Sequence, residues 1–144
     1  MCAVCAQPEW ESAVLVMRRK LRGKPMANVL LVEDQDCVRE VLADLLIDAG
    51  LDVAEAASGE EALDTLAQSG PPDVLVTDLD LGEGVSGLAL AEDLSRKWPA
   101  LGVVFISGRP WLIDQHPLRP RERFLEKPCL AHQLLAAVEE LRPH

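Results

Sequence analysis

The chain has 144 residues, which suits one domain with or without a short extension. A domain of this size buries roughly 70% of its unfolded surface, so it needs no metal or disulfide to hold it together. Its hydrophobic fraction of 49% is typical of a globular protein, and the absence of any run of about 18 apolar residues excludes a transmembrane helix. The formal net charge of −10 disfavours general nucleic-acid binding, which needs a basic surface, and suits a bound cation or a basic partner.

The first 25 residues differ in charge from the rest of the chain. They hold five basic and two acidic residues, whereas residues 26–144 hold nine basic and 22 acidic residues. The break falls at Gly23-Lys24-Pro25, a sequence that ends helices. We therefore predict an N-terminal extension over residues 1–25 and one domain over residues 26–144.

Two interpretations of the extension remain open. It is either sequence upstream of a true start at Met26, or a docking or dimerisation helix. The second interpretation rests on four apolar residues that share one face at helical spacing, namely Trp10, Val14, Met17 and Leu21.

The cysteines do not form a recognisable metal site. Cys2 and Cys5 make a C-x-x-C pair, but no second pair of cysteine or histidine ligands follows, so free thiols are the favoured interpretation. No secretory signal is visible, because the short apolar run 13–17 precedes the basic residues instead of following them. We expect a cytoplasmic location, where thiols stay reduced.

From Asn28 onward, short apolar runs alternate with segments of helical period. The apolar runs predict strands over residues 29–32, 51–56, 73–78 and 102–107, and a fifth strand centred on 124–125. The helical pattern predicts helices over residues 38–49, 58–70, 88–98 and 130–141. Ser58 and Glu61 form a capping box at the start of the second of these helices.

The segment between the fourth and fifth predicted strands is rich in proline. Its three prolines, Pro110, Pro117 and Pro120, leave room for barely two helical turns, so we predict a short or irregular fourth helix there. Trp111 is then either a core residue or a partner contact. Arg119, Arg121 and Arg123 are either a solvated strand edge or a basic strip for an acidic partner.

The alternation of strands and helices predicts an α/β fold, with a doubly wound parallel sheet and right-handed crossovers. The flavodoxin-like order 2-1-3-4-5 is the common arrangement for five strands. Ligands in such a sheet bind outside the carboxyl ends of the strands, at the switch point between the first and third strands.

Polar residues come at the carboxyl ends of four predicted strands. Glu33 and Asp34 follow the first strand, Asp78 ends the third, Ser107 ends the fourth, and Lys127 follows the fifth. Taken singly, each of these residues is also typical of a solvated turn or a helix cap. The functional prediction depends on all of them arriving at one edge of the sheet.

Three carboxylates in one crevice favour a bound cation. Each pair of charges about 4 Å apart repels by roughly 4 kcal/mol at an effective dielectric near 20, so either a proton or a metal must be taken up. Oxygen ligands with room for water suit Mg²⁺. A metal, the Lys127 ammonium and the Ser107 hydroxyl around Asp78 are suited to phosphoryl transfer onto that carboxylate.

Residues 28–141 resemble the receiver domain of two-component response regulators. The resemblance is carried by Glu33-Asp34 after Val-Leu-Leu-Val, Asp78 at the end of Asp-Val-Leu-Val-Thr-Asp, Ser107 in Phe-Ile-Ser-Gly, and Lys127-Pro128. It implies that Asp78 takes a phosphoryl group from a histidine kinase or a phosphotransfer protein. It also implies Mg²⁺ ligands from the side chains of Glu33, Asp34 and Asp78 and from the main-chain carbonyl of Asp80.

The resemblance further implies a switch. Ser107 matches a hydroxyl that turns toward the phosphoryl group, and Phe124 matches an aromatic residue that moves inward with it. Lys127-Pro128 is similar to the cis peptide of the family, X-Pro being where a cis bond costs least. New contacts of Ser107 and Lys127 in the phosphorylated state bias the surface around the fourth and fifth strands.

The expected protein is a single-domain regulator or a phosphorelay intermediate, not an enzyme beyond self-catalysed phosphoryl transfer and autodephosphorylation. Its expected partners are the phosphoryl donor and an unidentified downstream protein, with a homodimer left open and no direct binding to nucleic acid or membrane. Asp80 adds a carboxylate that is expected to alter the lifetime of the phosphoryl group, in a direction left open.

An alternative is a haloacid-dehalogenase-like, Mg²⁺-dependent phosphohydrolase that uses Asp78 and Asp80. The sequence Asp78-Leu79-Asp80 fits the Asp-x-Asp motif of that family. The nucleophile strand of that family comes first and its acidic metal pair comes late, whereas the order is reversed here. The chain also lacks room for the usual cap, so the receiver interpretation is favoured.

Overall fold

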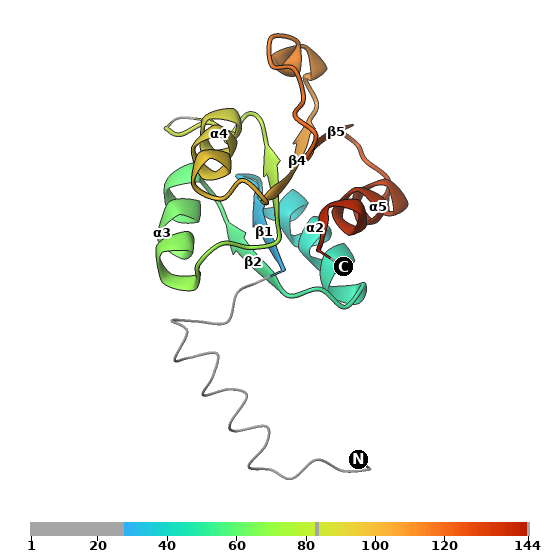
Figure 1. Cartoon of the computed structure of the whole chain (residues 1–144). Coiled ribbons are helices and arrows are strands. Elements are labelled where there is room, and N and C mark those ends of the chain that lie inside the picture. The colour runs from blue at the N-terminus through green and yellow to red at the C-terminus, as the bar shows by residue number, and fades with distance from the viewer. Residues whose placement is uncertain (1–27, 83, 144) are drawn as a thin grey trace, which may run out of the picture.

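The computed structural model describes residues 28–82 and 84–143 (Figure 1). Within these ranges, five parallel strands form one sheet in the order β2-β1-β3-β4-β5, which confirms the predicted fold class and strand order. The strands are β1 (Val29–Val32), β2 (Val53–Ala56), β3 (Val74–Asp78), β4 (Gly102–Ser107) and β5 (Glu122–Glu126). The predicted extension over residues 1–25 lies outside the described residues.

Helices cover both faces of the sheet (Figure 1). One face carries α2 (Asp36–Asp48) and α5 (Ala131–Leu141), and the other carries α3 (Gly59–Ser69) and α4 (Gly87–Lys97). Alternate strand residues divide the core, since Leu31 packs on the side of α2 and α5 while Leu30 packs on the side of α3 and α4. Burial on both faces explains why the central strands carry apolar residues at consecutive positions, not only at every second one.

The start of α3 agrees with the sequence. The Ser58 hydroxyl accepts the main-chain N–H of Glu61 at 3.1 Å, which confirms Ser58, from the predicted capping box, as the N-cap of α3.

The strand register places the polar residues at one edge of the sheet. Parallel pairing sets Val32 beside Thr77, Asp78 beside Ile106, and Ser107 beside Glu126. The residues that end β1, β3, β4 and β5 therefore meet at the same edge of the sheet.

The connection between β4 and β5 holds one 3-10 helix, η1 (Pro110–Ile113), and projects from the body of the fold (Figure 1). This confirms the predicted short, irregular fourth helix. Trp111 is 61% exposed, so it is not a core residue. The segment is tied to the sheet by His116, whose Nε2 lies 2.9 Å from Oε1 of the buried Glu122 and whose ring packs edge-on against Phe105.

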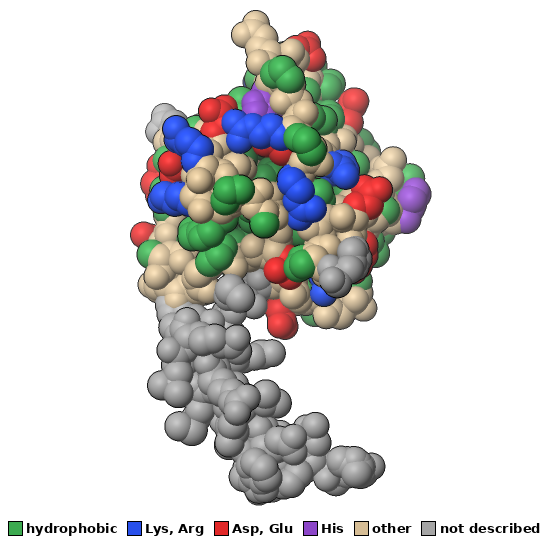
Figure 2. Space-filling view, in the orientation of Figure 1, with side chains coloured by type: hydrophobic (Ala, Val, Ile, Leu, Met, Phe, Trp, Pro, Cys, Tyr) green, Lys and Arg blue, Asp and Glu red, His purple; other side chains and the backbone are tan. Residues whose placement is uncertain are grey.

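Basic side chains gather on the face beside this projection (Figure 2). Two of the three arginines of the predicted basic strip are engaged with main-chain carbonyls. Arg121 donates to the carbonyls of Ala100 and Leu141, and Arg123 donates to those of Pro120 and Glu122. These two arginines therefore hold the start of β5 in place. Within the described ranges, no helix combines the length and apolar character needed to span a bilayer.

We predict that Gly87→Ala destabilises the fold, because α4 begins in close contact with the end of β3. A Cβ atom at Gly87 would overlap the main-chain oxygen of Asp78, so either the helix or the loop before it must shift. Overpacking of this kind lowers the free energy of unfolding by about 1–3 kcal/mol, measurable by urea denaturation. The matched control is Gly108→Ala, where the nearest atom to the new Cβ would be Cβ of Lys127 at 4.0 Å. Equal stability of the two variants would contradict the prediction.

Candidate functional site

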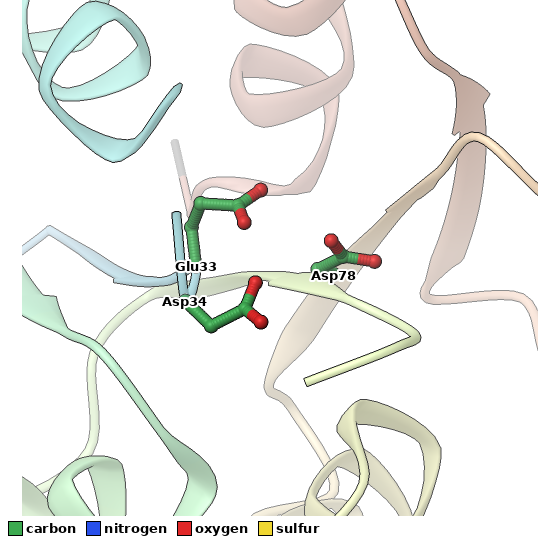
Figure 3. Close-up of side chains that lie close together, drawn as sticks. All are labelled: Glu33, Asp34 and Asp78. Atoms are coloured by element: carbon green, nitrogen blue, oxygen red, sulfur yellow. The ribbon is translucent and has the colours of Figure 1, made fainter. Parts of the chain in front are cut away.

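Three carboxylates from two neighbouring strands face one another at the carboxyl edge of the sheet (Figure 3). Glu33 and Asp34 directly follow β1, and Asp78 is the last residue of β3, the strand beside it. One oxygen from each carboxylate lies within 4.8 Å of the others. Glu33 is 2% exposed and Asp78 is 8% exposed, whereas Asp34 lies open to solvent.

Lys127 joins this cluster from the far end of the chain. Its Nζ donates to Oε1 of Glu33 at 2.7 Å and to Oδ2 of Asp78 at 2.8 Å. The Lys127-Pro128 peptide is cis, as the resemblance implies. One ammonium group therefore links both buried carboxylates.

The cluster remains short of positive charge despite this lysine. Burial raises the pKa of Glu33 and of Asp78 above their ordinary values, and the hydrogen bonds from Lys127 only partly oppose that effect. For Lys127, burial lowers the pKa, but the hydrogen bonds with Asp78 and Glu33 outweigh it and the pKa is raised. The site therefore favours an additional cation. Oxygen donors on a partly open edge match the preference of Mg²⁺, which keeps several of its waters.

A cavity of about 330 Å³ opens over the carboxylates. It is lined by residues that end or follow four different strands, among them Asp34, Asp78, Asp80, Ser107, Arg109 and Lys127. The main-chain N–H of Asp80 donates to Oδ1 of Asp78 at 3.0 Å, so both oxygens of Asp78 are held. The Asp80 carboxylate does not join the three-carboxylate cluster and instead pairs with the guanidinium of Arg109.

The two residues of the expected switch lie on neighbouring strands. Ser107 is buried at the end of β4, and its hydroxyl accepts the main-chain N–H of Arg109 at 3.0 Å. Phe124 is half-buried in β5, pairs in register with Phe105, and packs against the core on the side of α3 and α4. Ser107 lines the cavity, whereas Phe124 is paired with Phe105, two residues before Ser107 in β4.

Arg109 is the one cation of this cavity that the sequence did not predict. The available signal was its position two residues after Ser107, together with Asp80 two residues after Asp78. Periodicity places both residues near the carboxyl edge but does not reveal that their loops meet. That contact depends on the loop conformations.

Comparison with known proteins identifies the family. The family model of the response regulator receiver domain matches residues 29–139. Sensor kinase CckA from Brucella abortus is 36% identical over 118 residues, which are 80% of this chain and 12% of that protein. The transcriptional regulator KdpE from Escherichia coli is 37% identical over 84 residues, 58% of this chain and 36% of that protein. The chain thus spans only a minor part of these relatives.

Solved structures agree with the sequence comparison. A response regulator receiver protein from Sinorhizobium medicae has a TM-score of 0.73 and 27% identity, with 81% of this chain and 94% of that chain covered. The receiver domain of the hybrid histidine kinase CckA has a TM-score of 0.65 and 34% identity, with 78% and 96% covered. These matches give no support to the phosphohydrolase alternative.

The parallel sheet, the acidic cluster with its lysine, and the family match over residues 29–139 lead to one assignment. The chain belongs to the response regulator receiver domain family of two-component signal transduction.

Proposed function

We propose that this receiver domain, assigned to residues 26–144, accepts a phosphoryl group on Asp78 from a histidine kinase or a phosphotransfer protein. The observation that carries the proposal is the position of the Lys127 ammonium, 2.8 Å from Asp78 and 2.7 Å from Glu33, within a cavity open to a donor. The free thiols of Cys37 and Cys129 suit the reducing conditions of the cytoplasm.

In the transfer step, one carboxylate oxygen of Asp78 forms a bond to phosphorus. The bond between phosphorus and the donor atom breaks, and its electron pair leaves with the donor. Lys127 and the Asp80 N–H fix the orientation of the carboxylate before the donor arrives. The ammonium then faces the negative charge that the incoming phosphoryl group brings.

The residues that would hold Mg²⁺ are Glu33, Asp34 and Asp78 through their carboxylates and Asp80 through its main-chain carbonyl. When bound, the ion neutralises charge on the phosphoryl oxygens. Of the three carboxylates, Asp34 is the exposed one, so its side chain is the most accessible for coordinating the metal.

The proposed output is a change in the contacts of Ser107 and Phe124. The Ser107 hydroxyl, which now binds the main chain of Arg109, exchanges this partner for a phosphoryl oxygen. Phe124 then moves inward with Ser107. The surface around β4 and β5 changes as a result, and this changed surface binds a downstream protein. Self-catalysed loss of the phosphoryl group resets the domain.

The first of three predictions for the proposed function concerns the acceptor. Incubation with acetyl phosphate and Mg²⁺ should add the mass of one phosphoryl group, in a form labile to base, as measured by intact mass spectrometry. Asp78→Asn should abolish this label, whereas the control Asp64→Asn, at an exposed position of α3, should label normally. Labelling of Asp78→Asn at the wild-type level would contradict the assignment.

The second prediction concerns the metal. Asp34→Asn should weaken Mg²⁺ binding by at least about tenfold, measured by isothermal titration calorimetry, because it removes a ligand and leaves both contacts of Lys127 intact. Asp44→Asn removes an exposed carboxylate on α2 and serves as the matched control. Equal Mg²⁺ affinities for the two variants would remove Asp34 from the ligand set.

The third prediction concerns pH. Because burial raises the pKa of Asp78, the folded protein holds its proton more tightly than the unfolded chain, so stability falls as rising pH ionises this group. In EDTA at pH 7, Asp78→Asn should therefore have a higher Tm than the wild type. The difference should shrink as the pH falls toward about 4, the ordinary pKa of an aspartate, below which the folded and unfolded states both hold the proton. A lower Tm of the variant at pH 7 would contradict this account.

A further inference from the structure

The amino edge of the sheet, opposite the proposed phosphoacceptor cavity, carries an apolar cavity of about 490 Å³. Its apolar lining consists of Pro71, Pro72, Trp98, Ala100, Leu101 and Pro143, and its charged lining residues are Asp73 and Arg121. A second cavity of about 270 Å³ shares Leu101 and Arg121 with the first and reaches Glu122 at the start of β5. We call the two cavities together the amino-edge groove.

The carboxyl ends of three helices meet at this groove. Pro71 lies two residues beyond α3, Trp98 is the C-cap of α4, and Pro143 lies two residues beyond α5. The unpaired carbonyls at such ends carry partial negative charge, which a cation stabilises. α3 and α5 have no basic residue in their last turns, and the guanidinium of Arg121 donates to one carbonyl after α4 and one at the end of α5. The groove is therefore suited to a segment that is both apolar and basic.

The chain that precedes the described residues joins the fold beside this groove. Asn28 donates from Nδ2 to Oδ2 of Asp73 at 3.3 Å, and its main-chain oxygen accepts the N–H groups of Asp73 and Val74 at 3.0 Å. Asp73 is itself part of the groove lining. A segment tethered at Asn28 is therefore held near the groove at an effective concentration of about 1 mM.

Residues 1–25 have the composition that suits the groove. Four apolar residues share one face at helical spacing, namely Trp10, Val14, Met17 and Leu21. Five basic residues lie within residues 18–24 and two acidic residues precede them, which is the order that a helix dipole favours. Residues 26–144 hold nine basic and 22 acidic residues, so the domain as a whole attracts this basic segment.

The dimensions of the segment and of the groove agree. A helix over residues 10–21 is about 16 Å long. The amino ends of β1, β3, β4 and β5, which are neighbours in the sheet, cover about 14 Å at roughly 4.8 Å per strand. Residues 22–27 reach up to about 20 Å when extended, which is enough chain for the segment to turn back across this edge.

We propose that residues 10–21 dock in the amino-edge groove of the same chain as an amphipathic helix, with their apolar face on Trp98 and Leu101. The inference goes beyond the proposed function and does not depend on it, because the groove and the phosphoacceptor lie at opposite edges of the sheet. A basic amphipathic helix also fits an anionic membrane, but such a surface repels the acidic domain. The groove of a second copy lacks the advantage of the tether.

Hydrogen–deuterium exchange of the full chain, followed by mass spectrometry, tests the docking. At about 1 mM effective concentration, a contact with a Kd of about 0.1 mM keeps the segment bound for roughly nine-tenths of the time. The amides of residues 10–21 should then exchange roughly tenfold more slowly than in a variant that does not dock. Ala100→Arg should remove this protection, because Ala100 is an exposed lining residue and an arginine there fills the groove and repels the segment. The matched control Ala136→Arg, at an exposed position of α5 outside the groove lining, should keep the protection.

A second pair of variants changes only the segment. Met17→Glu places a charge on the apolar face and should also remove the protection, whereas Ser12→Glu places it on the opposite face of the predicted helix and should keep it. Exchange in β1 and β3 should be the same in all four variants, which shows that the domain stays folded. Labelling of Asp78 by acetyl phosphate should also be the same in all of them.

The outcomes separate the possible occupants of the groove. Equal exchange of residues 10–21 in the wild type, Ala100→Arg and Met17→Glu would overturn the inference. Protection that is lost on dilution, together with a dimer in analytical ultracentrifugation, would assign the groove to the segment of a second copy and overturn docking within one chain. Protection that arises only with phosphatidylglycerol vesicles would overturn it in favour of a membrane surface. Failure of Asp78 to label in the wild type would overturn the proposed function and leave this inference standing.

Discussion

A single ammonium group between two buried carboxylates organises the site of this domain. Lys127 is separated by 94 residues from Glu33 and by 49 residues from Asp78, yet its Nζ lies within 2.8 Å of both side chains. Burial makes the negative charges of Glu33 and Asp78 costly, and one lysine offsets that cost only in part. Because the carboxylate charge is only partly balanced, the cavity is suited to a cation. Lys127, together with that cation, then faces the negative charge of an incoming phosphoryl group.

A shared sheet edge brings these charged groups together. β1 and β3 are hydrogen-bonded neighbours, so the carboxylates that follow or end them must be close, and β5 brings Lys127 to the same edge two strands away from β3. The core on each face of the sheet fixes these strand ends. The loops beyond them, which carry Asp80 and Arg109, are more exposed, and their ion pair joins two loops that the sheet itself does not connect.

The sequence predicted those features of the fold and the site that leave a local pattern of residue types. The buried central strands appear as continuous apolar runs, so their positions and those of Glu33 and Asp78 could be predicted. The strand order followed from the common arrangement of five-stranded sheets. The start of β2 was placed two residues early, because the buried Leu51 belongs to the turn after α2, where its N–H bonds to the carbonyl of Leu46. Glu122 was missed as part of β5, since a buried carboxylate paired with His116 leaves no apolar signature.

A crystal structure of the chain with Mg²⁺ and beryllofluoride is the most direct test of the role of Lys127. We predict beryllofluoride on a carboxylate oxygen of Asp78, with Nζ of Lys127 within hydrogen-bond distance of a fluorine atom and the metal coordinated by the carboxylates around it. An acceptor site elsewhere in the chain, or a Lys127 side chain directed away from bound beryllofluoride, would contradict the central role assigned to this lysine.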